Sequence, residues 1–341
     1  MPLSFPPAQR TRRHRRSFTL LEVLVTLAIL LAILVALAQA MDSADRAVKS
    51  GASDPFAPAQ DAFETVAGRL ADATLETYED YADASGNFST NATLFVADHL
   101  ARRSDLAFAC GPATGASGLL AASQRTTAGS AIFFTAPEGA TQTYANQGLG
   151  HLLNDLGYFV EFGDDNSEPA FLLTAHRYRW RLRQVQQPSE ALQVYSVPGT
   201  SAWIQQLVPA GAAIPMLAEN VIALVVLPER YAADTGAALA PAYSYDSRNA
   251  ANAVTLNQLP PRLILALVAI DELSAERLAA QNGTNAPPLV PANLFQQGTP
   301  TQLTQDLATL DASLTAQKIG HRIFQREIQL PSAAWSNGGT P

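Results

Sequence analysis

The stretch RRSFTLLEVLVTLAILLAILVALAQA, residues 15–40, is apolar enough to enter a membrane, yet it carries one acid, Glu22, just inside its apolar part. Between residues 23 and 38 every residue except Thr26 is apolar, and this run contains neither Pro nor Gly. Counted from Phe18, a helix of this length spans about 30 Å at about 1.5 Å per residue, which is the thickness of the hydrocarbon core of a bilayer. The stretch therefore predicts a continuous helix that is long enough to cross a membrane.

Charge is distributed unevenly around this predicted helix. Five arginines stand between residues 10 and 16 with no acid among them, whereas the whole chain has a net charge of −8. Basic residues beside an apolar span are retained in the cytoplasm, so we expect the start of the chain there and the rest of it outside. The acidic body supplies no basic face, and we expect no nucleic-acid partner.

The chain has 341 residues, of which 48% are hydrophobic and 15% are charged, and this is enough apolar material for a sizeable core. Its single cysteine, Cys110, has no second cysteine for an intramolecular disulfide and cannot form a zinc site alone. We interpret Cys110 as a small buried hydrophobic residue.

The remainder of the chain has the pattern of an α+β fold with a largely antiparallel sheet. A break rich in Gly and Pro at residues 51–59 precedes a second helix at about residues 60–78, whose apolar stripe of Phe63, Val66 and Leu70 predicts packing against a sheet. Short helices are predicted from ELSAERLAAQ and TQDLATLDASL. The predicted strands are residues 93–97, 131–136, 157–162, 170–185, 219–229 and 261–271, with residues 321–330 open to a strand or a helix.

The segment at residues 177–183 alternates between basic and other side chains. As a strand it places Tyr178, Trp180 and Leu182 on one face and four arginines on the other. The favoured interpretation is a solvated face whose arginines pair with acids on a neighbouring strand. The alternative is a subunit contact or a patch for an anionic ligand.

Three kinds of N-terminal signal fit parts of residues 10–40. The basic start and the small residues at 36–40 fit a cleaved secretory signal, but the apolar run is longer than usual and contains Glu22. The sequence RRSFTL matches a twin-arginine export signal in part. The best fit is the third kind: FTLLEV at residues 18–23, after a short basic leader, resembles the start of the mature helix in the type IV prepilin family.

The resemblance to prepilins implies that a prepilin peptidase and N-methyltransferase cuts between Ser17 and Phe18 and methylates the new amine of Phe18. Glu22 is then fifth in the mature chain, where the family keeps a glutamate that pairs with the amine of a neighbouring pilin-like subunit. The family usually has Gly before the cut, where this chain has Ser17. A charge inside the apolar slab costs about 2.5–3.5 kcal/mol and marks function by default, and such a pair would fix the register between helices.

This interpretation divides the chain into four parts. Residues 1–17 are a basic leader, residues 18–50 a transmembrane and assembly helix with its polar extension, residues 51–80 a linker and second helix, and residues 81–341 a periplasmic β-rich domain. The resemblance implies a single-pass protein of the bacterial inner membrane, with a cytoplasmic N-terminus and a periplasmic C-terminal domain, that joins a filament after assembly.

The body also resembles known families. The segments LAENVIALVVLPE, NQLPPRLILALVAID and HRIFQREIQLPSAAW are similar to sheet strands of the larger minor pilins and of the J component pseudopilins of type II secretion. More narrowly, LGYFVEFG and RYRWRLRQVQQPSEALQVY resemble the Verru_Chthon cassette protein C family, from a prepilin-like gene cassette in Verrucomicrobia and relatives.

One acidic loop is a candidate cation site. The loop FGDDNSEPAF contains Asp164, Asp165, Asn166 and Glu168, and oxygen ligands of this kind suit Ca²⁺, which some pseudopilins carry in a loop of the sheet domain. The spacing is not that of an EF-hand, and Asp and Asn also favour ordinary turns. We therefore favour a turn and expect no cofactor, with calcium as the alternative.

Sequence motifs for catalysis are missing: the chain has no G-x-S-x-G, Walker, H-E-x-x-H or C-x-x-C pattern, and no two histidines are four residues apart. We therefore expect no enzyme and no catalytic residues. The sequence favours a minor pilin-like or pseudopilin structural subunit that assembles through its N-terminal helix. The alternative is an exported or membrane-anchored β-rich binding protein whose N-terminus is only a signal or anchor.

Overall fold

A computed structural model describes residues 27, 29, 30, 33, 34, 54–89, 95–115, 118–120, 125–164, 177–196, 202–231 and 236–335 of the chain. The chain forms two compact units, Met1–Pro55 and Phe56–Pro341. Among the residues that the structure describes, no helix is both long and apolar enough to cross a membrane. The described residues before Asp54 are all helical; they are Leu27, Ile29, Leu30, Ile33 and Leu34.

The three longest described helices of the second unit, α2, α4 and α5, begin where the sequence supplies a cap or a proline. The Asp271 side chain accepts a hydrogen bond from the Ser274 amide before α4, and Thr299 accepts one from Gln302 before α5, which also has Pro300 in its first turn. Both helices predicted from ELSAERLAAQ and TQDLATLDASL are confirmed. The described helices are α2 (Ala57–Ala71), η1 (Tyr144–Asn146), η2 (Ser189–Ala191), α3 (Ala202–Leu207), α4 (Glu272–Asn282) and α5 (Pro300–Ala316).

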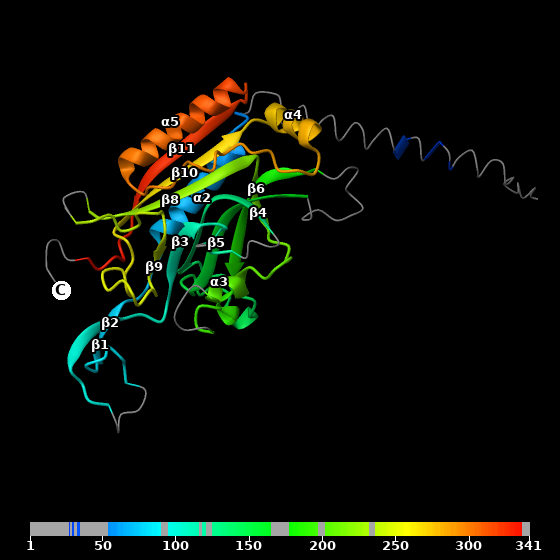
Figure 1. The fold of residues 1–341 in the computed structure, drawn as a ribbon. Helices are drawn as coiled ribbons and strands as arrows, with labels where there is room; N and C mark the ends of the chain where they lie inside the picture. Colours follow the sequence, from blue (N-terminus) through cyan, green and yellow to red (C-terminus); the bar gives the residue numbers. More distant parts are fainter. Residues whose placement is uncertain are drawn as a thin grey trace, which may run out of the picture. The chain divides into compact units, whose positions relative to one another are not determined.

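The strands form one large sheet and one small one (Figure 1). The large sheet has the order β11-β10-β8-β4-β5-β6-β7, with β3 paired to β4 and to β9, and the small sheet consists of β1 and β2. The strands are β1 (Tyr78–Ala82), β2 (His99–Arg103), β3 (Phe108–Pro112), β4 (Thr126–Ala136), β5 (Asn154–Gly163), β6 (Arg179–Gln187), β7 (Met216–Glu219), β8 (Val221–Glu229), β9 (Tyr245–Asp246), β10 (Arg262–Ile270) and β11 (His321–Gln329).

Strand pairing within the described residues is antiparallel except at one point, which confirms the predicted α+β fold with a mainly antiparallel sheet. The exception is the parallel contact of β4 with β8, which is made by Gly129 and Leu224 alone. Gly129 has a φ of +72°, and a Cβ there would lie 2.4 Å from the Leu224 carbonyl oxygen. Only glycine allows this close approach, which joins the β11-β10-β8 part of the sheet to the rest.

Helices lie on both faces of the sheet at its β11 end. Because the side chains of a strand alternate between the two faces, β11 can contact a different helix on each face. Even-numbered residues of β11 meet α2: the rings of Phe324 and Phe63 stack at 5.7 Å. On the opposite face, His321 contacts α5: its Nε2 lies 2.9 Å from Asp311 Oδ1. The neighbouring strands β8 and β10 are buried along almost their whole length.

The predicted boundaries differ from the structure in several places. The second helix ends at Ala71 and not near residue 78, because the chain turns there, Thr74 donates to the Thr135 carbonyl, and β1 begins at Tyr78. Residues 95–97 of the predicted strand 93–97 are not in a strand, and its other residues lie outside the described ranges. The predicted strand 219–229 is interrupted at Asn220, which has a φ of 61° and separates β7 from β8. Residues 321–329 form a strand.

Strands β1 and β2 form an arm that stands away from the large sheet (Figure 1). Its strands are in register with Tyr78 opposite Arg103 and Ala82 opposite His99. Asn257 tethers the base of the arm: its carbonyl accepts from Thr77 Oγ1 at 2.8 Å, and its side chain donates to the Arg102 carbonyl at 2.7 Å. We call β1, β2 and the connection between them the arm.

Candidate functional site

Three of the four arginines on the predicted solvated face are buried, so the prediction is wrong for them, whereas Arg177, which precedes β6, is exposed. Arg181 is fully buried, and the exposed fractions of Arg179 and Arg183 are 5% and 6%. The opposite face of β6 is buried as well, including Trp180 and Leu182. The reason is that other parts of the chain contact the arginine face: Arg183 donates to the Ile214 carbonyl in the segment before β7, and Arg179 donates to Glu272 of α4. The predicted pairing with acids on neighbouring strands is confirmed for Arg181 and Arg183, whereas the acid that pairs with Arg179 lies on a helix.

The most buried of the charge clusters has one carboxylate between two arginines. Glu161 on β5 accepts from Arg183 Nε at 3.0 Å and from Arg125 Nη1 at 2.7 Å. The side chains of Arg125, Glu161 and Arg183 are only 6%, 13% and 7% exposed, respectively. Arg183 also donates to the Ile214 carbonyl at 3.1 Å. We call Arg125, Glu161 and Arg183 the buried triad.

Arg181 is satisfied mainly by the backbone around it. Its Nη1 donates to the Gly163 carbonyl at 2.7 Å and its Nη2 to the Arg177 carbonyl at 3.1 Å. Its Nη2 also lies 3.2 Å from Glu219 Oε1 on β7. With its donors engaged in this way, the guanidinium holds the ends of three strands together.

Arg179 joins β6 to the first turn of α4. Its Nη1 donates to Glu272 Oε2 at 2.6 Å, and Asn220 donates to the same oxygen at 2.8 Å. Burial by itself raises the pKa of the Glu272 carboxyl, but the hydrogen bond from Arg179 and the charge of Arg179 outweigh burial and hold the pKa below its ordinary value of 4.5.

Replacing Glu272 by glutamine is expected to destabilise the protein at neutral pH and to have little effect in acid. The folded-state pKa of Glu272 is depressed, so its stabilising contribution is fully present above the unfolded-state pKa and is lost as pH falls through the folded-state pKa. Because the Glu272 side chain is 47% exposed, solvent screens the pair and we expect a loss of about 1 kcal/mol or less. Urea denaturation of wild type and Glu272→Gln from pH 7 to pH 3 measures the difference in their free energies of unfolding. A difference that stays constant over that range would contradict the depressed pKa of Glu272.

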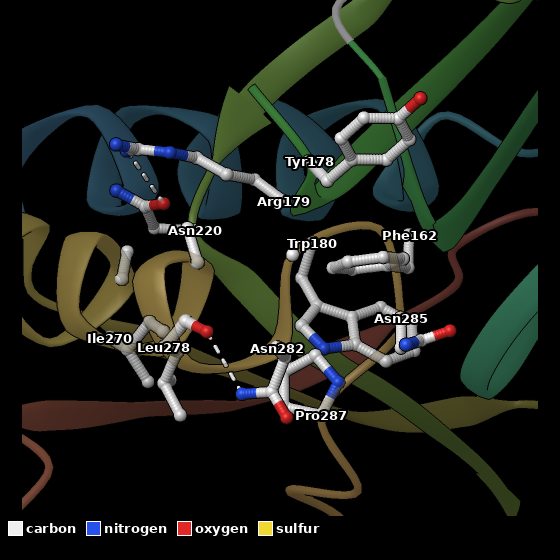
Figure 2. A pocket seen from close by; sticks show the side chains of 13 residues that line it. Phe162, Tyr178, Arg179, Trp180, Asn220, Ile270, Leu278, Asn282, Asn285 and Pro287 are labelled. Atoms are coloured by element: carbon white, nitrogen blue, oxygen red, sulfur yellow. Dashed lines mark hydrogen bonds between the residues drawn. The ribbon is translucent and has the colours of Figure 1, made fainter. Parts of the chain in front are cut away.

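A pocket lies between the start of β6 and α4 (Figure 2). Figure 2 shows the Trp180 indole between the ring of Phe162 and the segment that carries Asn282, Asn285 and Pro287. The Phe162 and Trp180 ring centroids are 5.3 Å apart in an edge-to-face arrangement. The cavity volume is about 20 Å³, which is room for little more than a water molecule and far below the roughly 300–1,000 Å³ of ligand sites.

Two buried donors beside this pocket have no hydrogen-bond partner among the described residues. They are Nε of Arg179 and Nε1 of the neighbouring Trp180. The walls of the pocket are otherwise aromatic, aliphatic and amide side chains, which supply no nucleophile and no acid–base pair for catalysis. The chemistry of this pocket is therefore that of packing and, at most, of binding.

The candidate calcium loop is described only at its start. Asp164 follows β5 directly and is half-buried, whereas Asp165, Asn166 and Glu168 lie outside the described residues. Within the described ranges, no three His, Cys, Asp or Glu side chains come together in a way that could hold a metal ion. Calcium binding at this loop stays a prediction.

Cys110 is completely buried in β3, as predicted for a small hydrophobic residue. Burial raises the pKa of its thiol far above the ordinary value, so the reactive thiolate does not form.

The predicted processing and assembly residues, Ser17, Phe18 and Glu22, lie outside the described residues. Their roles remain predictions from the sequence. Sequence patterns did not identify the acids that pair with the β6 arginines. Glu161 could have been noticed, because it is a single acid within the apolar strand segment GYFVEF. Glu272 and Asn220 are brought to Arg179 only by the fold.

Comparison with known families identifies the start of the chain. Residues 12–38 match the prokaryotic N-terminal methylation motif, and this range includes Ser17, Phe18 and Glu22. Neither the search of curated proteins nor the search of solved structures found a match. The motif supports a type IV pilin-like protein that a prepilin peptidase processes, and hence one that is anchored in a membrane or associated with a filament.

Proposed function

We propose that the chain is a minor pilin-like or pseudopilin subunit, assembled through its N-terminal helix into a pilus-like or type II secretion-like filament. The observation that carries the proposal is the methylation motif at residues 12–38, in which Glu22 stands fifth after the expected cut at Ser17. A prepilin peptidase and N-methyltransferase would free and methylate the Phe18 amine. The apolar helix would then pack beside those of other pilin-like subunits, with the Phe18 amine of one subunit against Glu22 of the next.

The size of the second unit supports a low-copy position. This unit, Phe56–Pro341, holds a nine-stranded sheet and its covering helices. A domain of this bulk is difficult to repeat along a thin filament, so a tip position suits it better. The membrane topology that we propose has the N-terminus in the cytoplasm of a bacterial inner membrane and the sheet domain in the periplasm.

Mass spectrometry of the mature N-terminus tests this function. We expect the mature chain from membranes of a host with a prepilin peptidase to begin with N-methyl-Phe18, and the uncut chain to accumulate when the peptidase is absent. Ser17→Gly, which restores the residue usual in the family, is expected to increase the mature fraction. A mature chain that begins at Met41 would contradict the proposal, because that cut removes both Phe18 and Glu22.

The second candidate is a membrane-anchored or exported binding protein. The observation that favours it is the pair of buried donors, Arg179 Nε and Trp180 Nε1, which have no hydrogen-bond partner among the described residues and lie beside the pocket between β6 and α4. The same mass measurement separates the two candidates, since a binding protein requires no methylated Phe18.

A further inference from the structure

The arm exposes apolar side chains that no described part of the chain covers. Tyr81 and Leu100 stand directly opposite one another in the β1–β2 register and are 57% and 55% exposed. Val96, just before β2, is 78% exposed. Single exposed apolar residues are ordinary, but here they lie together on a two-stranded sheet that stands away from the main sheet. A two-stranded sheet by itself is only marginally stable in water.

The two faces of the arm differ in the contacts that their side chains make. On the face of Tyr78, Arg103 forms an ion pair with Asp80 at 2.8 Å and lies over the Phe88 ring at 5.1 Å. Ala82 on this face is fully buried. On the face of Tyr81, Arg102 donates to the Ala253 carbonyl at 3.1 Å, but Tyr81 and Leu100 have no such cover among the described residues, and this is therefore the face that is available to a partner.

The uncovered face consists of two cross-strand pairs. Glu79 stands opposite Arg102, and Tyr81 stands opposite Leu100. Each pair combines one residue of β1 with its complement on β2: an acid with a base, and an aromatic ring with an aliphatic side chain. We call these four residues the arm face.

We propose that the arm face binds the arm face of a second copy of this chain. A two-fold axis parallel to the strands and midway between two facing arms places β1 of one copy over β2 of the other at the same level. Glu79 of one copy then faces Arg102 of the other, and Tyr81 faces Leu100. The face is thus complementary to itself in both charge and apolar character, which is the requirement for a symmetric two-fold contact.

The contact is small and closes on itself. A face of four residues a side is well below the roughly 800 Å² per partner of a stable interface, so the paired arms dissociate readily in dilute solution. Two copies held in one membrane or one assembly meet at a much higher effective concentration. Because a two-fold contact is complete after two copies, it joins a pair of subunits and does not extend a filament.

Cross-linking of the full chain in its membrane tests the contact. Ser85 lies in the turn after β1 and outside the arm face, and Cys110 is fully buried, so Ser85→Cys supplies the reactive thiol. With a short bis-maleimide, we expect Ser85→Cys to form dimers at least several times faster than Tyr144→Cys. Tyr144 is the matched control because it is 86% exposed and lies outside the arm. Equal rates at the two positions would overturn the proposal.

A charge exchange between copies gives the sharper test. In the Ser85→Cys chain, Glu79→Arg alone places like charges opposite each other in the pair of copies, and Arg102→Glu alone does the same, so each is expected to reduce dimers several-fold. In a mixture of the two differently tagged variants, the introduced arginine of one copy faces the introduced glutamate of the other, and the unchanged Glu79 faces the unchanged Arg102. We therefore expect mixed dimers at the original rate. Within one chain each variant keeps its like-charged cross-strand pair, so a role confined to the single arm predicts no recovery.

Resistance to proteolysis equal to that of the parent shows that both variants are folded. If such folded variants form no mixed dimers, the proposal is overturned. Because Arg102 also donates to the Ala253 carbonyl, Glu79→Arg mixed with the parent provides a second measurement that leaves this tether intact. That mixture is expected to give dimers at an intermediate rate, since one of its two Glu79–Arg102 contacts remains. The contact does not depend on cleavage at Ser17, so its failure and the failure of the proposed function are distinguishable.

Discussion

Replacing Glu161 by glutamine is expected to lower the free energy of unfolding by about 3–5 kcal/mol, because it leaves the charges of Arg125 and Arg183 buried without a counter-charge. Both guanidinium groups contact this carboxylate and are almost completely buried. Denaturant titration followed by tryptophan fluorescence measures the loss, with the fully buried Trp203 as a reporter of the core.

The control for the buried triad is Glu64→Gln. Glu64 binds Arg326 through two hydrogen bonds of 2.6 and 2.7 Å, but both side chains are 47% exposed, so we expect a loss of about 0–1 kcal/mol. Replacement of all three members by apolar residues, Arg125→Met, Glu161→Leu and Arg183→Met, is expected to recover much of the stability. A Glu161→Gln variant that unfolds at the same denaturant concentration as Glu64→Gln would show that burial does not strengthen the triad.

Replacing Glu22 by alanine is expected to reduce incorporation of the mature chain into its assembly by roughly tenfold or more. The expectation rests on the cost of about 2.5–3.5 kcal/mol for a charge in the apolar slab, which the Phe18 amine of a neighbour would offset, and on about 1.4 kcal/mol for each tenfold change in an equilibrium. The variant inserts into the membrane as well as the parent or better, because it no longer carries that charge.

Quantitative immunoblotting of sheared filaments against membranes measures the effect, with other subunits followed in the same samples. Glu64→Gln serves as a matched control, since it removes a carboxylate from the body and leaves the apolar helix unchanged. Unaltered incorporation of Glu22→Ala, with normal processing at Phe18, would show that the pairing of Glu22 with the amine is not needed.

The sequence predicted best those elements whose pattern is set locally. Strands β8 and β10 are continuous apolar runs because both of their faces are covered, and α4 and α5 begin at Asp271 and Thr299, which cap them. Strand β11 remained open between strand and helix, because one of its edges is free of strand partners in the described sheet and many of its residues are exposed.

Burial of charge could not be predicted from local pattern. Alternating arginines are typical of a strand with one solvated face, but in this fold the segment before β7 and helix α4 contact the arginine face of β6. The acids that compensate them, Glu161, Glu219 and Glu272, lie far away in sequence from the arginines and are brought to them only by the fold. The motif at residues 12–38 is the reverse case, because it is read from consecutive residues and needs no knowledge of the fold.

The meeting of Gly129 with Leu224 has a consequence for how the domain is made. The antiparallel pairs β4–β5, β5–β6 and β8–β10 connect segments that follow one another closely, so they form at modest cost in chain entropy. The contact of Gly129 with Leu224 closes a long loop and must wait for β8. During synthesis from the N-terminus, β4 therefore emerges well before the strand that covers this edge. The interval between them is when the half-made sheet is most open to pairing with the wrong chain.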